Sequence, residues 1–237
     1  MDFFTDIHTH ILPGIDDGAK TPDDSLAMID IAYNEGTRKI VLSPHYYPAG
    51  FGDTYDKARE ALELLTGLCR EKYPDLRLYL GNELHYTRDC TSHLGSGRCR
   101  TANGTDYVMI DFTEGEKAAV IEKALHKILN TGYRPVLAHA ERYTDLPIDK
   151  IEELHRSGII IQINAQSVLG HGGFIRKRRA KKLLASQTAD IVSSDCHDVK
   201  HRPPLLRECY GSVAQKYGES YADYLFGKTA NKLFELD

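Results

Sequence analysis

The sequence contains no tryptophan, only three methionines and only five cysteines among its 237 residues. The cysteines are odd in number, irregularly spaced, and include no Cys-x-x-Cys pair. This pattern argues against the disulfide framework of a small secreted protein and against a structural zinc site built on thiolates. We therefore expect a cytoplasmic protein.

Long apolar runs and an excess of positive charge are also missing. No stretch is long enough to cross a bilayer, so we expect no membrane insertion. The formal net charge of −4 gives no sign of a nucleic-acid-binding surface. The exception is a short basic run, which we interpret as a solvated helix face. It comprises Arg176, Lys177, Arg178, Arg179, Lys181 and Lys182.

Short apolar segments alternate with longer amphipathic ones along the chain. The apolar segments predict strands at 3–7, 39–43, 76–80, 107–110, 135–138, 159–163 and 189–194. Helices are predicted at 23–34, 55–72, 116–130, 149–156, 176–185, 204–216 and 229–236. Seven strand–helix units predict an α/β fold, a distorted TIM-like (β/α)7 barrel formed by a single domain of residues 1–237. Residues 87–105 are expected to form a loop that could contain a hairpin.

Metal-ligating side chains follow six of the seven predicted strands. Sites in α/β barrels form at the carboxyl ends of strands, so these side chains are expected to meet. Residues two apart point to the same side of a strand, so His8 and His10 can reach one ion. Each residue alone could be structural, but the whole set indicates a metal site. The candidate ligands are His8, His10, Asp17, His45, Glu83, Asp111, His139, Asp195 and His197.

The types of ligand narrow the choice of metal. The set contains four carboxylates, which would repel one another at close range unless cations lay between them. Nine ligands are too many for one ion, so two or three ions with a bridging carboxylate are needed. Mixed imidazole and carboxylate donors suit manganese, iron or catalytic zinc.

Two groups of motifs resemble known families. His8-Thr9-His10, Gly14-Ile15-Asp16-Asp17-Gly18 and Ser43-Pro44-His45 resemble the polymerase-and-histidinol-phosphatase (PHP) superfamily. The later motifs resemble the bacterial manganese-dependent protein-tyrosine phosphatases associated with capsule and exopolysaccharide synthesis. They are Gly81-Asn82-Glu83, Met109-Ile110-Asp111-Phe112, His139-Ala140-Glu141-Arg142-Tyr143, Ser194-Asp195-Cys196-His197 and Arg202-Pro203-Pro204. The resemblance covers nearly the whole chain.

This resemblance implies a PHP fold and three divalent ions, with manganese favoured over iron or zinc. The first ion would be held by His8, His10, Glu83 and Asp195, the second by Glu83, Asp111 and His139, and the third by Asp17, His45 and His197. Arg142 and Arg202 would bind the phosphate. The chain departs from the family where Asp111 replaces glutamate and where Ala140 replaces proline. The implied substrate is a phosphotyrosine protein, such as a bacterial tyrosine kinase that regulates capsule synthesis.

The predicted mechanism is attack on phosphorus by a metal-bridged hydroxide. A rival thiol mechanism rests on Cys196 and Arg202, which have the spacing used by cysteine-dependent tyrosine phosphatases. The loop between them contains no glycine, which such phosphate-binding loops usually include. Two other functions stay open, namely a small-molecule phosphatase such as histidinol-phosphatase and a non-catalytic metal-binding regulatory module.

Overall fold

A computed structural model describes residues 3–51 and 54–237 of the chain. Within these ranges every strand pairs in parallel with its neighbours, as the alternating pattern predicts. The strands are β1 (Phe4–Thr9), β2 (Thr37–Leu42), β3 (His45–Tyr46), β4 (Arg77–Leu80), β5 (Glu83–His85), β6 (Tyr107–Asp111), β7 (Arg134–Leu137), β8 (Ile160–Asn164) and β9 (Ile191–Ser193). All seven predicted strands are present.

Two predicted strands continue beyond a break, which explains the two additional labels. β2 stops before Ser43-Pro44, since proline has no backbone N–H to donate to a ladder, and β3 resumes at His45. β4 stops before Gly81-Asn82, and β5 resumes at Glu83. The β2–β4 pairing therefore continues as β3–β5, and the sheet divides into the orders β1-β2-β4 and β3-β5-β6-β7-β8-β9. A bridge between Thr9 and Cys196 links the two ends of the curled array.

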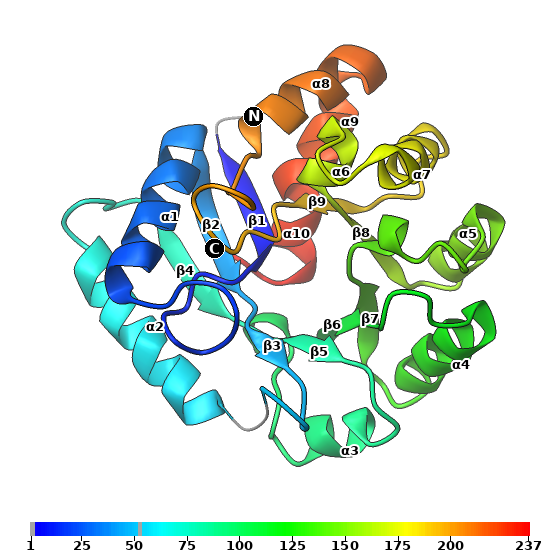
Figure 1. Cartoon of the computed structure of the whole chain (residues 1–237), viewed down its shortest axis with the longest axis horizontal. Coiled ribbons are helices and arrows are strands. Elements are labelled where there is room, and N and C mark those ends of the chain that lie inside the picture. Colours follow the sequence, from blue (N-terminus) through cyan, green and yellow to red (C-terminus); the bar gives the residue numbers. More distant parts are fainter. Residues whose placement is uncertain (1–2, 52–53) are drawn as a thin grey trace.

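Most of the helices surround the strands on the outside, whereas α10 (Thr229–Leu233) lies near the centre beside β1 (Figure 1). The others are α1 (Pro22–Glu35), α2 (Tyr55–Cys69), α3 (Cys90–Gly95), α4 (Ala118–Leu129), α5 (Ile148–Arg156), α6 (Ala165–Leu169), α7 (Phe174–Ala185), α8 (Arg207–Tyr217) and α9 (Glu219–Asp223). Single turns occur at η1 (Ala102–Gly104), η2 (Ala140–Arg142) and η3 (Tyr224–Lys228). The predicted α/β fold, with a parallel sheet curled into a distorted barrel, is confirmed in this arrangement.

The ends of α1 follow from its sequence. Thr21 accepts a hydrogen bond from the Asp24 amide, and the Asp24 carboxylate accepts one from the Thr21 amide, which completes a capping box. Pro22 occupies the first turn, where its missing N–H costs nothing. Gly36 ends the helix with a φ of 103°, a conformation that favours glycine.

Several sequence-based boundaries differ from the structure, and the short helices α6 and α9 were not predicted. Residues 87–105 contain α3 and η1 rather than a hairpin, so that expectation was wrong. α2 ends at Cys69 instead of residue 72. α8 begins at Arg207, because Pro203 and Pro204 hold the preceding segment extended.

The carboxyl-terminal segment covers the amino ends of the first strands. Phe234 and Ala230 pack against Ile7 and Val41 inside the curled sheet. Lys39 donates a hydrogen bond to the Leu236 carbonyl, which ties the segment to β2. The candidate ligands lie at the other end of the strands, their carboxyl ends. None of the helices in the described ranges is both long and apolar enough to traverse a bilayer.

Candidate metal centre

The structure brings all nine predicted ligands together at the carboxyl ends of the strands. His8 lies at the end of β1, His45 and Glu83 begin β3 and β5, and Asp111 ends β6. The remaining residues lie in the segments that directly follow strands β1, β7 and β9. Every one of the nine belongs to at least one group whose ligand atoms lie within 4.8 Å of one another.

The centre of the cluster consists of two imidazoles that face two carboxylates. The His8 Nε2 atom lies 3.2 Å from Glu83 Oε2 and 3.5 Å from Asp195 Oδ1. The His10 Nε2 atom lies 3.3 Å and 3.4 Å from the same two oxygens. All four side chains are almost fully buried. These are the residues that the resemblance assigns to a first ion.

A second group lies on the side of β6 and β7. The His139 Nε2 atom lies 2.8 Å from Glu83 Oε1 and 3.6 Å from Asp111 Oδ1. Glu83 thus turns one oxygen to the central group and the other to this one, as a bridging carboxylate would.

A third group lies on the opposite side of the centre. The Asp17 Oδ1 atom lies 3.3 Å from His45 Nε2 and 3.5 Å from His197 Nε2. Gly18 lets the Asp17 loop approach β1, because a Cβ atom at this position would overlap the His10 carbonyl oxygen. This close approach accounts for the glycine of the Asp-Asp-Gly motif.

The polar atoms at the centre fit a bound cation. The atoms His8 Nε2, His10 Nε2 and Glu83 Oε2 are buried and make no hydrogen bond in the described part of the chain. Buried polar groups normally have partners, so unpartnered nitrogen and carboxylate atoms that converge on one point need another group between them. Imidazole and carboxylate are suitable donors for a divalent transition metal, so the donor set fits the metal that the family resemblance implies.

The carboxylates and imidazoles of the cluster stabilise one another's charged forms. Burial opposes ionisation of Glu83, but the neighbouring His8 and His45 outweigh it and hold the pKa of Glu83 well below its usual value. Burial also opposes the charge of His45, and Glu83 and Asp17 outweigh it and raise the pKa of His45 to about 10. Protons and metal ions therefore compete for the same imidazole nitrogens.

Two of the candidate ligands have unusual backbone conformations. His139 has a φ of 35° and Asp195 a φ of 53°, both in the left-handed region that residues with a Cβ rarely adopt. Such conformations persist where the surrounding structure imposes them, and they concentrate at functional sites. In this chain they direct both side chains into the cluster.

Three residues that orient the ligands were not among the predicted site residues. Asp16 accepts a hydrogen bond from His10 Nδ1 at 2.7 Å and another from the His45 amide at 2.9 Å. Gln162 Oε1 lies 3.2 Å from His8 Nδ1 and accepts from the His139 amide at 2.7 Å. Asn164 donates to Asp195 Oδ2 at 2.7 Å. The sequence held one indication of the role of Gln162, which is a polar residue inside an apolar strand. A buried polar side chain normally has a hydrogen-bond partner.

Asp111, which replaces the family's glutamate, has two partners of its own. Its Oδ2 atom lies 2.8 Å from His85 Nδ1, and its Oδ1 atom accepts from the Tyr143 hydroxyl at 3.0 Å. These contacts fix the orientation of the shorter side chain toward His139. The second group is therefore kept in place despite the loss of one methylene.

We expect Asp16→Asn to weaken metal binding or activity by roughly 10- to 100-fold, the usual cost of removing a carboxylate that orients a ligating histidine. The amide cannot accept from His10 as strongly as the carboxylate, so the ring loses its fixed orientation. A metal titration followed by enzyme assay measures the effect. Asp23→Asn, an exposed acid at the start of α1, is the matched control and should behave as wild type.

The two predicted phosphate-binding arginines converge on one oxygen of Asp195. Arg142 and Arg202 each place a guanidinium nitrogen 2.6 Å from Asp195 Oδ2. Both side chains are partly exposed, at 20% and 31%, whereas Asp195 is buried. The cluster therefore has a positively charged rim with donors that can reach a bound anion.

Cys196 does not have the surroundings of a nucleophile. Its side chain is fully buried and packs with the apolar residues Ile11 and Met28. Burial raises the pKa of the Cys196 thiol to about 12, so the thiolate is scarce at neutral pH. Arg202, its partner in the rival interpretation, is paired with Asp195 instead.

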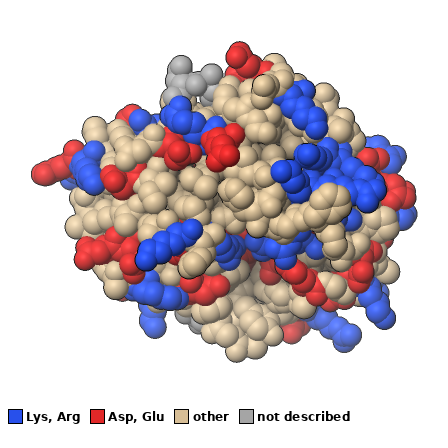
Figure 2. Space-filling view, turned by 45° about the horizontal axis from the view of Figure 1, so that its top comes forward, with Lys and Arg blue, Asp and Glu red and all other residues tan. Residues whose placement is uncertain are grey.

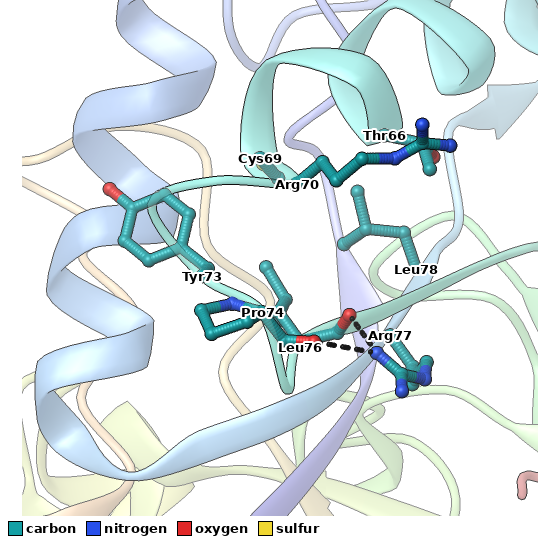
Figure 3. Close-up of a pocket in the computed structure, with 8 residues that line it drawn as sticks. All are labelled: Thr66, Cys69, Arg70, Tyr73, Pro74, Leu76, Arg77 and Leu78. Carbon is teal, nitrogen blue, oxygen red and sulfur yellow. Dashed lines mark hydrogen bonds between the residues drawn. The ribbon is translucent and has the colours of Figure 1, made fainter.

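A separate pocket lies near the amino end of β4, away from the carboxyl-end cluster. Figure 3 shows its lining of Thr66, Cys69, Arg70, Tyr73, Pro74, Leu76, Arg77 and Leu78, which come from the end of α2, the following turn and the start of β4. Arg77 donates to the carbonyls of Pro74 and Leu76 within this turn. No candidate ligand lines the pocket, so it is not part of the metal centre.

Comparisons with known proteins agree with this geometry. Residues 4–235 match the family model described as capsular polysaccharide synthesis, CpsB/CapC. The chain belongs to the CpsB/CapC family. It is 32% identical over 235 residues to the tyrosine-protein phosphatase CpsB of Streptococcus pneumoniae, covering 96% of this chain and 97% of the relative. It is 29% identical over 231 residues to the tyrosine-protein phosphatase YwqE of Bacillus subtilis, covering 96% and 90%.

Solved structures extend the comparison. A crystal structure from work on YwqE of Bacillus subtilis and CpsB of Streptococcus pneumoniae, described as metal-dependent tyrosine phosphatases, superposes with a TM-score of 0.89 at 27% identity. The match covers 98% of this CpsB/CapC chain and 94% of the other. A histidinol phosphate phosphatase from Lactococcus lactis superposes with a TM-score of 0.59 at 12% identity, covering 90% and 94%. At that identity the second match shows a shared fold alone, the PHP fold.

Proposed function

We propose that this chain is a metal-dependent protein-tyrosine phosphatase and that residues 1–237 form one metallophosphatase domain. The observation that carries the proposal is the cluster of nine ligand side chains, buried at its centre, beside two arginines. The names of the CpsB and YwqE relatives support phosphotyrosine as the substrate. We further propose a cytoplasmic location and, as substrate protein, a tyrosine kinase that regulates capsular or exopolysaccharide synthesis.

We propose that the cluster holds three ions and that these are manganese. His8, His10, Glu83 and Asp195 would hold the first, and Glu83, Asp111 and His139 the second. Asp17, His45 and His197 would hold the third, for which the His10 ring lies within reach. When bound, such ions supply Lewis-acid chemistry and lower the pKa of a coordinated water.

The side chains of the protein have separate tasks in this proposal. Arg142 and Arg202 bind the phosphoryl oxygens and neutralise the charge that develops on them. Asp195 holds both guanidinium groups at the rim before substrate arrives. Asp16 and Gln162 fix the ring orientations of His10 and His8. Preorganised groups of this kind need no rearrangement at the moment of reaction.

We expect Cys196→Ala to retain most of the phosphatase activity. The thiol lies in an apolar environment, and its removal leaves the ligands on either side unchanged. The measurement is hydrolysis of a phosphotyrosine peptide together with metal content. Loss of activity with full metal content would contradict the proposal and favour a thiol mechanism.

The substrate class is tested by comparing hydrolysis of a phosphotyrosine peptide with hydrolysis of histidinol phosphate. The proposal requires a higher kcat/KM for the peptide. A higher value for histidinol phosphate would indicate a small-molecule phosphatase. Failure of both to react with metal fully bound would indicate a regulatory metal-binding module.

A further inference from the structure

The six basic residues of 176–182 divide into two sets. Three of them contact other groups of the protein. Arg176 pairs with Glu114 at 2.6 Å, Lys177 donates to the Leu169 carbonyl, and Arg179 donates to backbone carbonyls. The other three, Arg178, Lys181 and Lys182, are exposed and take part in no ion pair among residues 3–51 and 54–237. Three unpaired positive charges next to one another on one helix can attract an anionic partner.

These three residues share one face of α7 with two exposed apolar side chains. Phe174 is 79% exposed and Ile175 61% exposed. The helical spacing places both on the side of Arg178 and Lys182, opposite the buried Leu183 and Leu184. Figure 2 shows Lys and Arg side chains gathered on the side of the molecule where α7 lies in Figure 1. We call Phe174, Ile175, Arg178, Lys181 and Lys182 the α7 outer face.

The α7 outer face is continuous with the rim of the metal centre. A pocket of about 590 Å³ is lined by Arg142 at one side and by Phe174 and Ile175 at the other. A second pocket of about 300 Å³ extends from Phe174 to Arg178 and Lys182. A third, of about 350 Å³, continues along Lys181 and Lys182.

Arg179 joins this helix to the segment that carries Arg142. Its guanidinium donates to the carbonyls of Glu141 at 3.0 Å, Tyr143 at 2.8 Å and Leu146 at 2.7 Å. The outer face and the phosphate-binding arginine therefore hold a fixed position relative to each other. A surface at a fixed distance from Arg142 can contact the residues that flank a phosphotyrosine bound there.

We propose that the α7 outer face is the docking surface for an Asp- and Glu-rich segment of the substrate protein next to its phosphotyrosine. The acidic side chains pair with Arg178, Lys181 and Lys182, and an apolar residue of the same segment covers Phe174 and Ile175. Charge complementarity selects this partner, and the pocket that reaches Arg142 favours a substrate segment over a lipid surface. The inference rests on the proposed phosphatase function.

The test uses the metal-loaded enzyme with peptides of equal length that carry phosphotyrosine flanked by Asp and Glu or by neutral residues. We expect kcat/KM to be about tenfold higher for the acidic peptide and the difference to shrink at high salt. The variant Arg178→Ala/Lys181→Ala/Lys182→Ala should lose this preference while it hydrolyses free phosphotyrosine as wild type does. Lys57→Ala/Arg59→Ala/Arg70→Ala, exposed residues of α2 and its end on the other side of the molecule, is the matched control and should keep the preference.

Several results would overturn the inference. Equal kcat/KM for the acidic and neutral peptides would refute the proposed docking surface but would not contradict the proposed phosphatase function. An equal loss on free phosphotyrosine in the α7 variant would mean that these residues act through the active site. Binding to phosphatidylserine vesicles that the α7 variant loses, without any peptide preference, would assign the face to a membrane. No hydrolysis of any phosphotyrosine substrate would overturn both proposals.

Discussion

Glu83→Gln is expected to reduce kcat by on the order of a thousandfold, the effect of removing a central electrostatic element of an active site. The two carboxylate oxygens of Glu83 face different groups of ligands, with His8 and His45 near Oε2 and His139 near Oε1. The amide keeps the shape but replaces one acceptor oxygen by a donor, which cannot bridge cations.

Metal content and thermal unfolding distinguish this effect from misfolding. Wild-type protein should bind several ions per chain, and its melting temperature should rise when metal is added, because an ion that binds only the folded state stabilises it. The variant should bind fewer ions and show a smaller rise. Glu63→Gln, a change at an exposed acid on α2, is the control. A variant with full metal content and full activity would contradict the bridging role.

Replacing both Arg142 and Arg202 by methionine is the second change with a large expected effect. We expect kcat/KM for a phosphotyrosine peptide to fall by roughly a thousandfold, since two donors to the phosphoryl group are lost together. Metal content should remain close to wild type, because neither arginine is a candidate ligand.

The free-energy effects of the two single substitutions on kcat/KM should not sum to the effect of the double substitution. Both guanidinium groups contact the same oxygen of Asp195, and residues that share a partner are energetically coupled. Kinetic measurements on the two single variants and the double variant complete the cycle. Strict additivity would show that the arginines act independently, and an unchanged kcat/KM would show that they do not bind the phosphate.

Local sequence signals predicted the strands and the ligands at their ends. The strands are short, apolar and bounded by Pro44, Gly81 or a polar residue. The hydrophobic pattern and these bounding residues were therefore sufficient to predict them. The continuation of two strands as β3 and β5 was not predictable, because strands of two and three residues are defined by their pairing with neighbours, β3 with β5 and β5 with β6. The helix in 90–95 was missed since six residues are too few to show a helical period.

The residues that support the ligands depend on distant contacts. Gln162 meets His8 across 154 positions of the chain, and Asn164 meets Asp195 across 31. No local pattern encodes such pairs. The interpretation of the basic run as a solvated face holds for part of it only, because Arg179 is directed inward to three carbonyls of the Arg142 segment.

Hydrolysis of phosphotyrosine by this protein should depend on metal held by the nine ligands. The decisive experiment removes metal with a chelator and measures peptide hydrolysis as Mn²⁺, Zn²⁺ or Mg²⁺ is returned, with the bound ions per chain determined at each step. We expect no activity in the stripped protein and recovery in proportion to bound metal, greatest with Mn²⁺. Full activity in the stripped protein, with inactivation by a thiol reagent, would contradict this dependence on metal.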